Sequence, residues 1–383
     1  MNLEQSIPSG SAALLYKVNQ LKYRATMTVS HSKSEKVIHG HTDLRIALRD
    51  TQKYSSDLQG DSDVRDYRQI PLEVDPPKHH VYRSLLAPHF VKPAIESHAD
   101  EFASISHRLL HQYFQNTGLD VVADLALPLV MENLGVIYRR PQDVAEWVSW
   151  GSDVWTAESE VRDGAVLHRY LDRIYKEALE GRTKDVWQEI ASLEIDGIQI
   201  SESEFRGIAG VLLAGGRDTV IKLLTGSLWH FAKHPEDADR LRANPDLIPR
   251  AVQELLRFLS PLPAMNRTTV PESSTEELPP DRYVSMSFIS GNFDETVFAN
   301  PLEIDLDRER NPHLSFGFGP HTCIGNHVTE VEARVFLETF LAMNIRIEIS
   351  ESEIIFHQDR LINVPDRFVS LKVVAWSPPS GLN

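Results

Sequence analysis

A ten-residue loop, FGFGPHTCIG at residues 316–325, holds the only cysteine of the 383-residue chain. Gly317 and Gly319 allow backbone angles and close approaches that other residues do not, and Pro320 stiffens the turn. We expect a helix directly after Cys323, whose free N–H groups would favour the thiolate. One thiolate cannot complete a tetrahedral zinc site, but it can be the single axial ligand of a haem iron. The alternative is a small buried hydrophobe, the commoner fate of a lone cysteine.

The composition is that of a globular protein with a sizeable core, since 42% of the residues are hydrophobic and 25% are charged. No linker, internal repeat or low-complexity tract divides residues 1–383, which predicts a single domain. The N-terminal segment has only the short apolar stretch AALLY, so neither a signal peptide nor a membrane anchor is expected. A single cysteine forms no internal disulfide and fits a reducing compartment. We therefore expect a cytoplasmic protein.

The charge balance limits the possible partners. Acidic residues outnumber basic residues by 55 to 39, which gives a formal net charge of −16. This excess disfavours binding to nucleic acid or to anionic lipid. A local basic patch for an acidic protein partner remains possible.

Helical patterns outnumber strand patterns, which predicts a mainly α fold. The clearest helix begins with a capping box formed by Ser201 and Glu204. Its apolar pattern continues to Pro235, and a single rod of this length would measure roughly 48 Å. The rod contains the sequence AGG, in which each glycine costs about 1 kcal/mol relative to alanine. A buried helix that keeps two consecutive glycines is expected to make room for another group.

The remaining expected elements follow the same rules of period and capping. Asp75 is expected to cap a helix that runs to about Pro88, with Pro76 or Pro77 in its first turn. Residues 92–180 are expected to be mostly helical, with breaks at Gly118, Pro128 and Pro141. Further helices are expected within residues 41–50, 235–245, 246–261 and 326–344, and strands at 25–31, 36–40, 345–349 and 368–376.

Three other stretches carry candidate functional residues. In ELLR, Glu254 and Arg257 lie three residues apart on one helix face, where opposite charges meet; the alternative is a solvated surface pair. In AGGRDTV, a carboxylate and a hydroxyl are adjacent at Asp218 and Thr219, a combination that can relay protons. The alternative there is a threonine that bonds a carbonyl one turn back.

The fourth stretch is DPPKHHVYR, in which His79 and Arg83 lie four residues apart on one helix face. Taken together and in this order, the four stretches resemble the cytochrome P450 family. The cysteine loop matches the family pattern Phe-Gly-x-Gly-x-His/Arg-x-Cys-x-Gly at every fixed position, and the resemblance covers roughly residues 24–375. It implies the P450 fold, a helix-rich triangular prism with a small β-rich region. Haem b would lie between the long central helix and the helix after the cysteine loop.

The resemblance also implies roles for individual residues. Cys323 would be the thiolate ligand of the haem iron, and Asp218 and Thr219 would deliver protons at the oxygen site. Glu254 and Arg257 would be structural and would support the cysteine loop. The other cofactor-binding residues would be Phe316 and Gly325 of that loop, together with His79, Arg83, Arg267 and His321 as partners of the haem propionates, which need cations or donors when buried.

The implied activity is that of a monooxygenase. It would insert one oxygen atom from O2 into a small or medium organic substrate, by hydroxylation or oxidative dealkylation. No flavin or nicotinamide domain fits in the chain, so electrons would come from a ferredoxin or flavodoxin with an NAD(P)H-dependent reductase. Such carriers are commonly acidic, and Lys78, Arg83 and Lys92 could form a basic docking face.

By position in the family, the substrate pocket should be mostly apolar. Trp150 and Trp155 lie where relatives have a mobile roof, although core or surface packing fits them equally well. The expected pocket residues are Leu212, Ala214, Gly215, Pro263, Ala264, Met265, Leu361 and Ile362.

Two rival functions remain. Peroxide-driven members of the family carry arginine and proline in place of the acid–alcohol pair, whereas here Arg217 precedes an intact pair. One residue on a helix is a rotation of about 100°, which would turn Arg217 away from the haem and favours oxygen over peroxide. A non-catalytic haem sensor would need no proton relay and would be expected to carry an effector domain.

Overall fold

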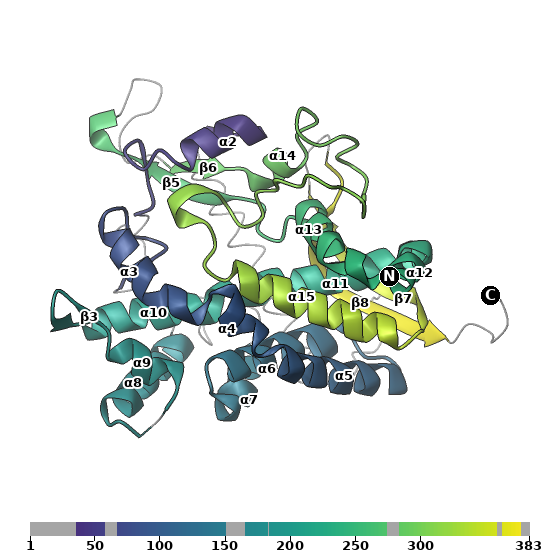
Figure 1. Ribbon diagram of the computed structural model, residues 1–383, viewed down its shortest axis with the longest axis horizontal. Coiled ribbons are helices and arrows are strands. Elements are labelled where there is room, and N and C mark those ends of the chain that lie inside the picture. Colours follow the sequence, from purple (N-terminus) through teal and green to yellow (C-terminus); the bar gives the residue numbers. More distant parts are fainter. Residues whose placement is uncertain are drawn as a thin grey trace, which may run out of the picture.

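The computed structural model describes residues 36–57, 67–150, 165–182, 184–273, 283–357 and 362–376. Within these ranges helices dominate and the strands are few and mostly short (Figure 1), as the sequence predicts. The strand expected at residues 25–31 lies outside the described residues.

The first half of the described chain contains short helices and two longer ones, α5 and α8. Its helices are α2 (His41–Ala47), α3 (Lys78–Leu86), η1 (Ala87–His89), α4 (Lys92–Glu96), α5 (Ala99–Gln115), the π-helical η2 (Val121–Ala126), α6 (Leu127–Ile137), η3 (Pro141–Asp143), α7 (Val144–Ser149), α8 (Ala165–Leu179) and α9 (Val186–Ala191). Pro128 does not break this region, because it lies in the first turn of α6, where its missing N–H is not needed.

The second half contains long helices, α11 and α15 among them, together with several short ones. Its helices are α10 (Glu202–Gly215), α11 (Arg217–Lys233), α12 (Pro235–Ala243), η4 (Pro245–Leu247), α13 (Ile248–Leu259), η5 (Pro271–Ser273), α14 (Phe288–Asn292), η6 (Gly319–His321) and α15 (Asn326–Ala342). Helices α5, α6, α11 and α15 pack against one another around a large apolar core, and α15 runs beside α11 and α5 in Figure 1.

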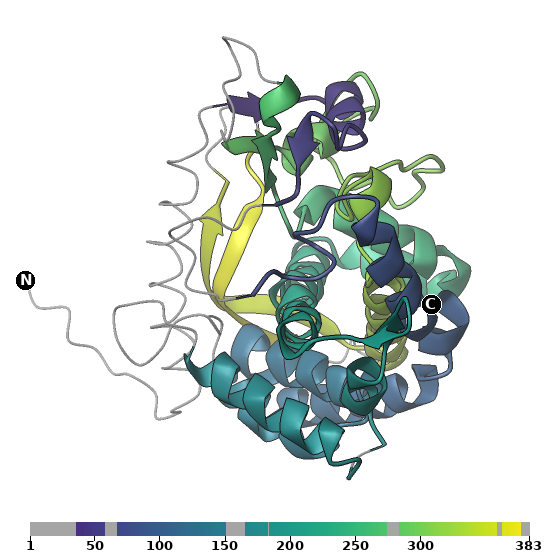
Figure 2. The ribbon, with the colours of Figure 1, turned by 90° about the vertical axis from the view of Figure 1, so that its left-hand side faces the viewer.

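Three small sheets complete the fold. One has four strands in the order β1 (Lys36–Ile38), β6 (Tyr283–Met286), β5 (Met265–Thr269) and β2 (Tyr54–Ser55), with β1 parallel to β6 and the other pairs antiparallel. The others are hairpins, β3 (Glu194–Ile195) with β4 (Ile198–Gln199) and β7 (Arg346–Phe356) with β8 (Pro365–Trp376). The long β7–β8 hairpin packs along α11. In Figure 2 its yellow strands lie beside the helices. A second, smaller core lies under α2 and the four-stranded sheet.

The expected single rod from Ser201 to Pro235 is wrong, because α10 ends at Gly215 and α11 begins at Arg217. A Cβ atom added at either Gly215 or Gly216 would meet no atom within 4 Å, so the break borders open space. The start of α10 is as predicted. The Ser201 hydroxyl accepts from the Glu204 N–H at 3.2 Å, and a Glu204 carboxylate oxygen accepts from the Ser201 N–H at 2.8 Å.

The predicted cap of α3 is also wrong. Pro77 occupies the N-cap position and provides no side-chain cap. The Asp75 carboxylate instead accepts hydrogen bonds from the Ser55 hydroxyl and from the Ser56 N–H, the latter at 2.8 Å. Asp75 therefore joins the start of α3 to strand β2. The sequence pattern could not distinguish this distant partner from a local cap.

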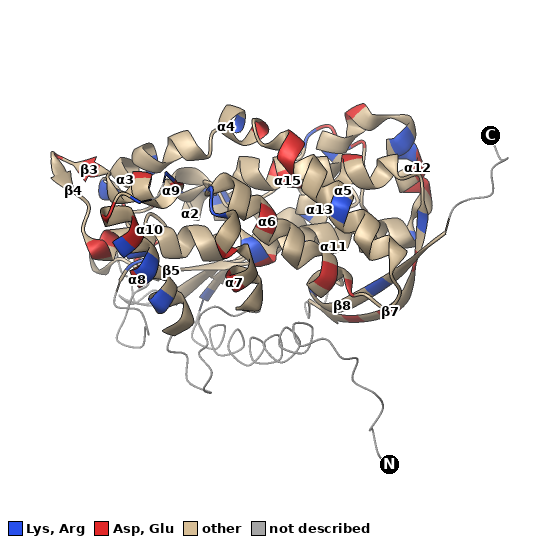
Figure 3. Cartoon of the chain, turned by 90° about the horizontal axis from the view of Figure 1, so that it is seen from below, with Lys and Arg blue, Asp and Glu red and all other residues tan. Residues whose placement is uncertain are grey.

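Among the described residues, no helix is both long and apolar enough to cross a bilayer. Acidic and basic residues are interspersed along the helices and strands in the view of Figure 3.

Candidate functional site

The cysteine loop has the unusual backbone that its sequence predicts. Gly317 and Gly319 have φ angles of +67° and +79°, in the region that glycine adopts without strain. A Cβ atom at Gly319 would also lie 2.8 Å from the Leu48 carbonyl oxygen, so only glycine fits against α2 at this position. The Cys323 N–H donates to the Phe316 carbonyl at 2.8 Å and closes the loop.

The Cys323 thiol is accessible, although the protein around it desolvates it. Helix α15 begins at Asn326, the first residue of the expected helix 326–344, with Gly325 as its N-cap, so two residues separate it from Cys323. Burial raises the pKa of the thiol, while the Gly325 N–H and Arg83 act in the opposite direction. The N–H group at the start of the helix thus favours the thiolate, as expected, but burial of the thiol outweighs it. A metal ion that binds a thiol deprotonates it outright, so the iron would have to supply that effect.

Donor groups with few acceptors gather beside this loop. The imidazole rings of His79 on α3 and His321 on η6 lie 4.1 Å apart between centroids. Neither ring nitrogen of His79, nor Nε2 of His321, has a hydrogen-bond partner among the described residues. Burial and the nearby cations lower the pKa of His79 to about 4 and that of His321 to about 3.

Two arginines complete this group. The Arg267 side chain on β5 is 4% exposed and donates to the adjacent Asn266 carbonyl at 2.9 Å. Burial lowers the pKa of Arg267 to about 10. Arg83 is half-buried and interacts electrostatically with Cys323.

This donor set suits an anion, because buried cations and donors are costly without acceptors, and the Asp75 carboxylate is the acidic group that acts on both His79 and Arg267. The orphaned nitrogens of His79 and His321, with Arg267 beside them, suit carboxylates. Cys323 offers a soft ligand close by. The residues present therefore fit haem b, which carries two propionates and takes a thiolate as axial ligand.

The break between α10 and α11 presents one accessible stripe. Gly215 and Asp218 are exposed and Thr219 is half-buried, whereas the Arg217 side chain is only 3% exposed. The difference in exposure fits the rotation of about 100° between successive helical residues, but the Arg217 Nε still lies 3.8 Å from an Asp218 carboxylate oxygen. The Thr219 hydroxyl lies 3.5 Å from the Gly215 carbonyl one turn back, at the limit for a hydrogen bond. The alternative, in which the Thr219 hydroxyl is bonded to the carbonyl one turn back, is therefore at most weakly supported.

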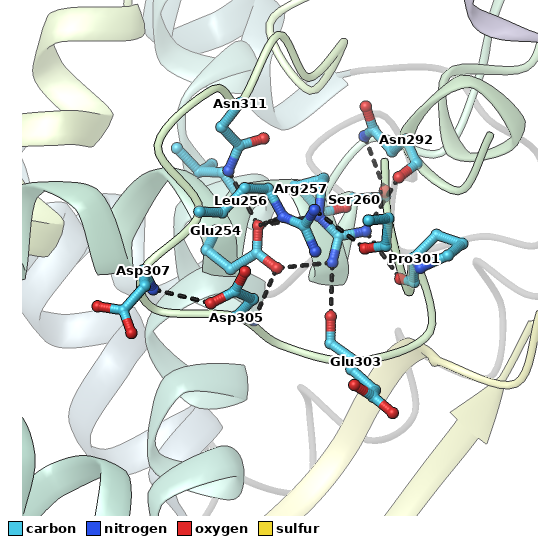
Figure 4. A network of polar contacts seen from close by, with 12 residues as sticks. Glu254, Leu256, Arg257, Ser260, Asn292, Pro301, Glu303, Asp305, Asp307 and Asn311 are labelled. Atoms are coloured by element: carbon cyan, nitrogen blue, oxygen red, sulfur yellow. Dashed lines mark hydrogen bonds and ion pairs between the residues drawn. The ribbon is translucent and has the colours of Figure 1, made fainter. Parts of the chain in front are cut away.

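Glu254 and Arg257 are both fully buried, which excludes a solvated surface pair. Arg257 donates through Nε and Nη2 to the two carboxylate oxygens of Glu254, at 2.9 and 2.7 Å. The remaining N–H groups of Arg257 donate to the carbonyls of Asn292, Pro301 and Glu303. As Figure 4 shows, the ion pair thereby holds the chain segment between α14 and the cysteine loop.

Sequence reasoning missed several members of this network. Arg308 Nε and Asn311 Nδ2 donate to the same Glu254 oxygen at 2.9 and 3.0 Å. Asn292 accepts from the Leu314 N–H at 2.6 Å and donates to the hydroxyls of Ser260 and Ser315. Asn292 belongs to the segment GNFD, where the family commonly has Ala-Asn-Arg-Asp, and that similarity was the available signal. Arg308 and Asn311 carry no recognisable spacing.

The expected pocket residues divide between the two cores. Leu212 and Ile362 are buried in the main core, and the Leu212 carbonyl accepts from the Tyr138 hydroxyl at 2.9 Å. Met265 packs against the smaller core, and Pro263, Ala264 and Ala214 are half-buried. The Trp150 ring lies edge-on to the Tyr170 ring, with 5.1 Å between the ring centroids. This contact agrees with the alternative that Trp150 packs against the protein. Leu361 and Trp155 lie outside the described residues.

Comparison with known proteins decides the family. The model of the family described as "Cytochrome P450" matches residues 165–365, more than half of the chain. The chain belongs to the cytochrome P450 family. This P450 is 30% identical to cyclomarin C epoxidase CymV of Salinispora arenicola, over 72% of this chain and 74% of the relative. It is 29% identical to the steroid C26-monooxygenase of Mycolicibacterium smegmatis, over 70% and 71%.

A solved structure described as that of a carbohydrate-active P450 covers 88% of this chain and 91% of its own, with 30% identity and a TM-score of 0.81. The P450 fold and the monooxygenase class are therefore established for this protein, with haem b as its cofactor. A substrate, O2 and a redox partner follow in general terms from that class.

Proposed function

We propose that this P450 oxidises a small or medium organic molecule, by hydroxylation or dealkylation, with electrons from a separate carrier protein. The observation that carries the proposal is the pair of unpartnered histidines, His79 and His321, beside the loop of Cys323, and the accessible Asp218–Thr219 stripe supports it. Bound haem b supplies the iron at which O2 is activated and one oxygen atom passes to the substrate. The rest of the proposal concerns the residues of this chain.

In this proposal Cys323 is the iron ligand, presented by a loop whose backbone is fixed by two positive-φ glycines. His79, His321 and Arg267 bind the propionates, and Arg83 lies close enough to Cys323 to take part in either interaction. Their low exposure matters, because hydrogen bonds to charged groups are stronger where water is excluded.

Asp218 and Thr219 move protons. Asp218 has a side chain that is 45% exposed and can exchange protons with solvent. The Thr219 hydroxyl is held only weakly by the Gly215 carbonyl at 3.5 Å, so it is available to donate to an oxygen ligand or a water. Arg217 is buried and its Nε lies 3.8 Å from the Asp218 carboxylate, but the acid–alcohol pair itself is intact, which supports O2 and electrons over peroxide as the oxidant.

A Thr219→Ala variant should form roughly a hundredfold less product per NAD(P)H consumed, because a proton-transfer group is lost. Released peroxide should account for the missing electrons. Thr219→Ser keeps the hydroxyl and should behave nearly as the wild type. The substrate for the assay is first found by screening compounds for a change of iron spin state in the holoprotein.

Peroxide-driven turnover should persist in Thr219→Ala, which separates loss of proton delivery from damage to the site. Unchanged NAD(P)H-driven product formation in this variant would assign the proton role to another group and would contradict the proposed role of Thr219.

The electron carrier is proposed to dock on a basic face around the cysteine loop. Arg45 of α2 and Arg49, just after this helix, lie over the ring of Phe318, at 4.1 and 4.6 Å from its centroid. Lys78 on α3 is exposed, and Lys92 is exposed at the start of α4. An acidic ferredoxin or flavodoxin would be attracted to this face despite the overall negative charge.

The double change Arg49→Glu and Lys92→Glu should slow reduction by an acidic ferredoxin about tenfold at low salt and flatten the salt dependence of the rate. Stopped-flow measurement of haem reduction provides the rate. Lys176→Glu, an exposed site on α8, is the matched control and should leave the rate unchanged. Equal slowing in both variants would reflect net charge alone and would contradict docking at this face.

A further inference from the structure

A lysine continues the accessible stripe of α11. Gly215, Asp218 and Thr219 follow one another at helical spacing, and Lys222 is the next residue on this side, three positions after Thr219. Unlike the others it is buried, with 8% of its surface exposed. Lysine is almost never buried without a partner. This one lies one turn beyond the proposed proton-delivery pair.

The Lys222 ammonium has a single hydrogen-bond partner. Its Nζ donates to the Ser260 carbonyl at 3.3 Å, and the described residues offer no acceptor for the other two N–H groups. The charged side chains that face it are Asp366 and Arg367, at the start of β8. Burial lowers the pKa of Lys222 to about 8, so the amine can lose its proton under mildly alkaline conditions.

Ser260 is a junction between three parts of the fold. It follows α13 with a left-handed φ of 40°, and its hydroxyl donates to the Arg257 carbonyl at 2.8 Å. The same hydroxyl accepts from Asn292 Nδ2 at 2.9 Å. The Ser260 side chain is thus fixed to the Glu254–Arg257 network, and its carbonyl is fixed to α11 by Lys222. The chain then continues to the expected pocket residues 263–265 and to Arg267.

We propose that Lys222 is a positioning residue, which ties the helix carrying Asp218 and Thr219 to the Ser260 turn and holds it fully only while protonated. A charged donor makes the stronger hydrogen bond to a carbonyl. Loss of the charge would therefore loosen α11 relative to the segment that leads to residues 263–267. The consequence for catalysis, though not the tether itself, rests on the proposed roles of Asp218 and Thr219.

The tether is tested by hydrogen exchange of the haem-loaded protein, which needs no substrate. In Lys222→Met, peptides covering residues 256–267 should exchange at least about tenfold faster than in the wild type at about pH 7. After correction for intrinsic rates, the wild type should approach this behaviour at about pH 9.5, where the amine is neutral. Lys222→Arg keeps its charge at both pH values and should stay protected.

The control is Lys233→Met, the same substitution at an exposed position of the same helix. It should leave exchange of residues 256–267 unchanged. If Lys222→Met leaves the exchange unchanged, or if it accelerates exchange equally throughout the protein, the proposal is wrong.

The catalytic consequence has a separate readout. In NAD(P)H-driven turnover of a screened substrate, the fraction of electrons released as peroxide should rise above about pH 8 in the wild type and be high at every pH in Lys222→Met. Lys222→Arg should restore the low fraction. Faster hydrogen exchange in Lys222→Met without a rise in the peroxide fraction would support the tether and count against the proposed roles of Asp218 and Thr219. A flat pH profile in the wild type would contradict control by the Lys222 charge.

Discussion

Replacing Cys323 with serine should remove the thiolate signature from the carbon monoxide difference spectrum of the reduced haem protein. NAD(P)H-driven turnover should fall by roughly a hundredfold or more, equivalent to about 2.7 kcal/mol of transition-state stabilisation. The reason is electronic, because the thiolate is the ligand that favours O–O cleavage. The loop should keep its shape, since the Cys323 N–H bond to the Phe316 carbonyl and the glycine φ angles do not involve the sulfur.

Thr322→Ser is the matched control, because it alters the adjacent side chain and keeps its hydroxyl, which donates to the Gly319 carbonyl at 2.8 Å. This variant should retain both the spectrum and most of the activity. Retention of the thiolate signature in Cys323→Ser would overturn the assignment of the iron ligand. Loss of the signature in both variants would instead indicate that the loop is too easily deformed for the comparison.

The parts of the site that the sequence predicts are those with a local physical cause. Gly317 and Gly319 occur where the backbone must be left-handed, and Gly319 also packs against the Leu48 carbonyl. The capping box at Ser201 and Glu204 depends on residues three apart, and so does the ion pair of Glu254 with Arg257. Such features are fixed by spacing along one element and can be recognised before any tertiary structure is known.

The parts that could not be predicted depend on contacts between distant segments. Asp75 forms a polar link to strand β2 because that strand happens to lie within reach. The pKa of Cys323 is raised because burial outweighs the nearby Gly325 N–H and Arg83. The expectation of a thiolate considered only the N–H groups at the start of the next helix and left out burial of the thiol.

The Glu254 network shows how much a distant partner can matter. One carboxylate pairs with two buried guanidinium groups, those of Arg257 and Arg308, which come from segments about fifty residues apart in the chain. It also accepts from the Asp305 N–H at 2.9 Å. The ELLR spacing indicates only the first of these contacts. The contact with Arg308 explains why position 254 should tolerate no neutral residue.

Glu254→Gln should therefore destabilise the protein strongly, by about 3–5 kcal/mol, because two buried cations lose their counter-ion. The amide of glutamine would also direct its own donors towards guanidinium groups that can only donate. The haem-loaded variant should unfold at a lower denaturant concentration and release haem earlier than the wild type. Glu338→Gln is the matched control, since Glu338 pairs with Arg334 on the exposed face of α15. Breaking that surface pair should cost no more than about 1 kcal/mol. Equal shifts of the unfolding midpoint in the two variants would mean that burial does not strengthen the Glu254 pairs. The network would then be one of several comparable contacts around the cysteine loop.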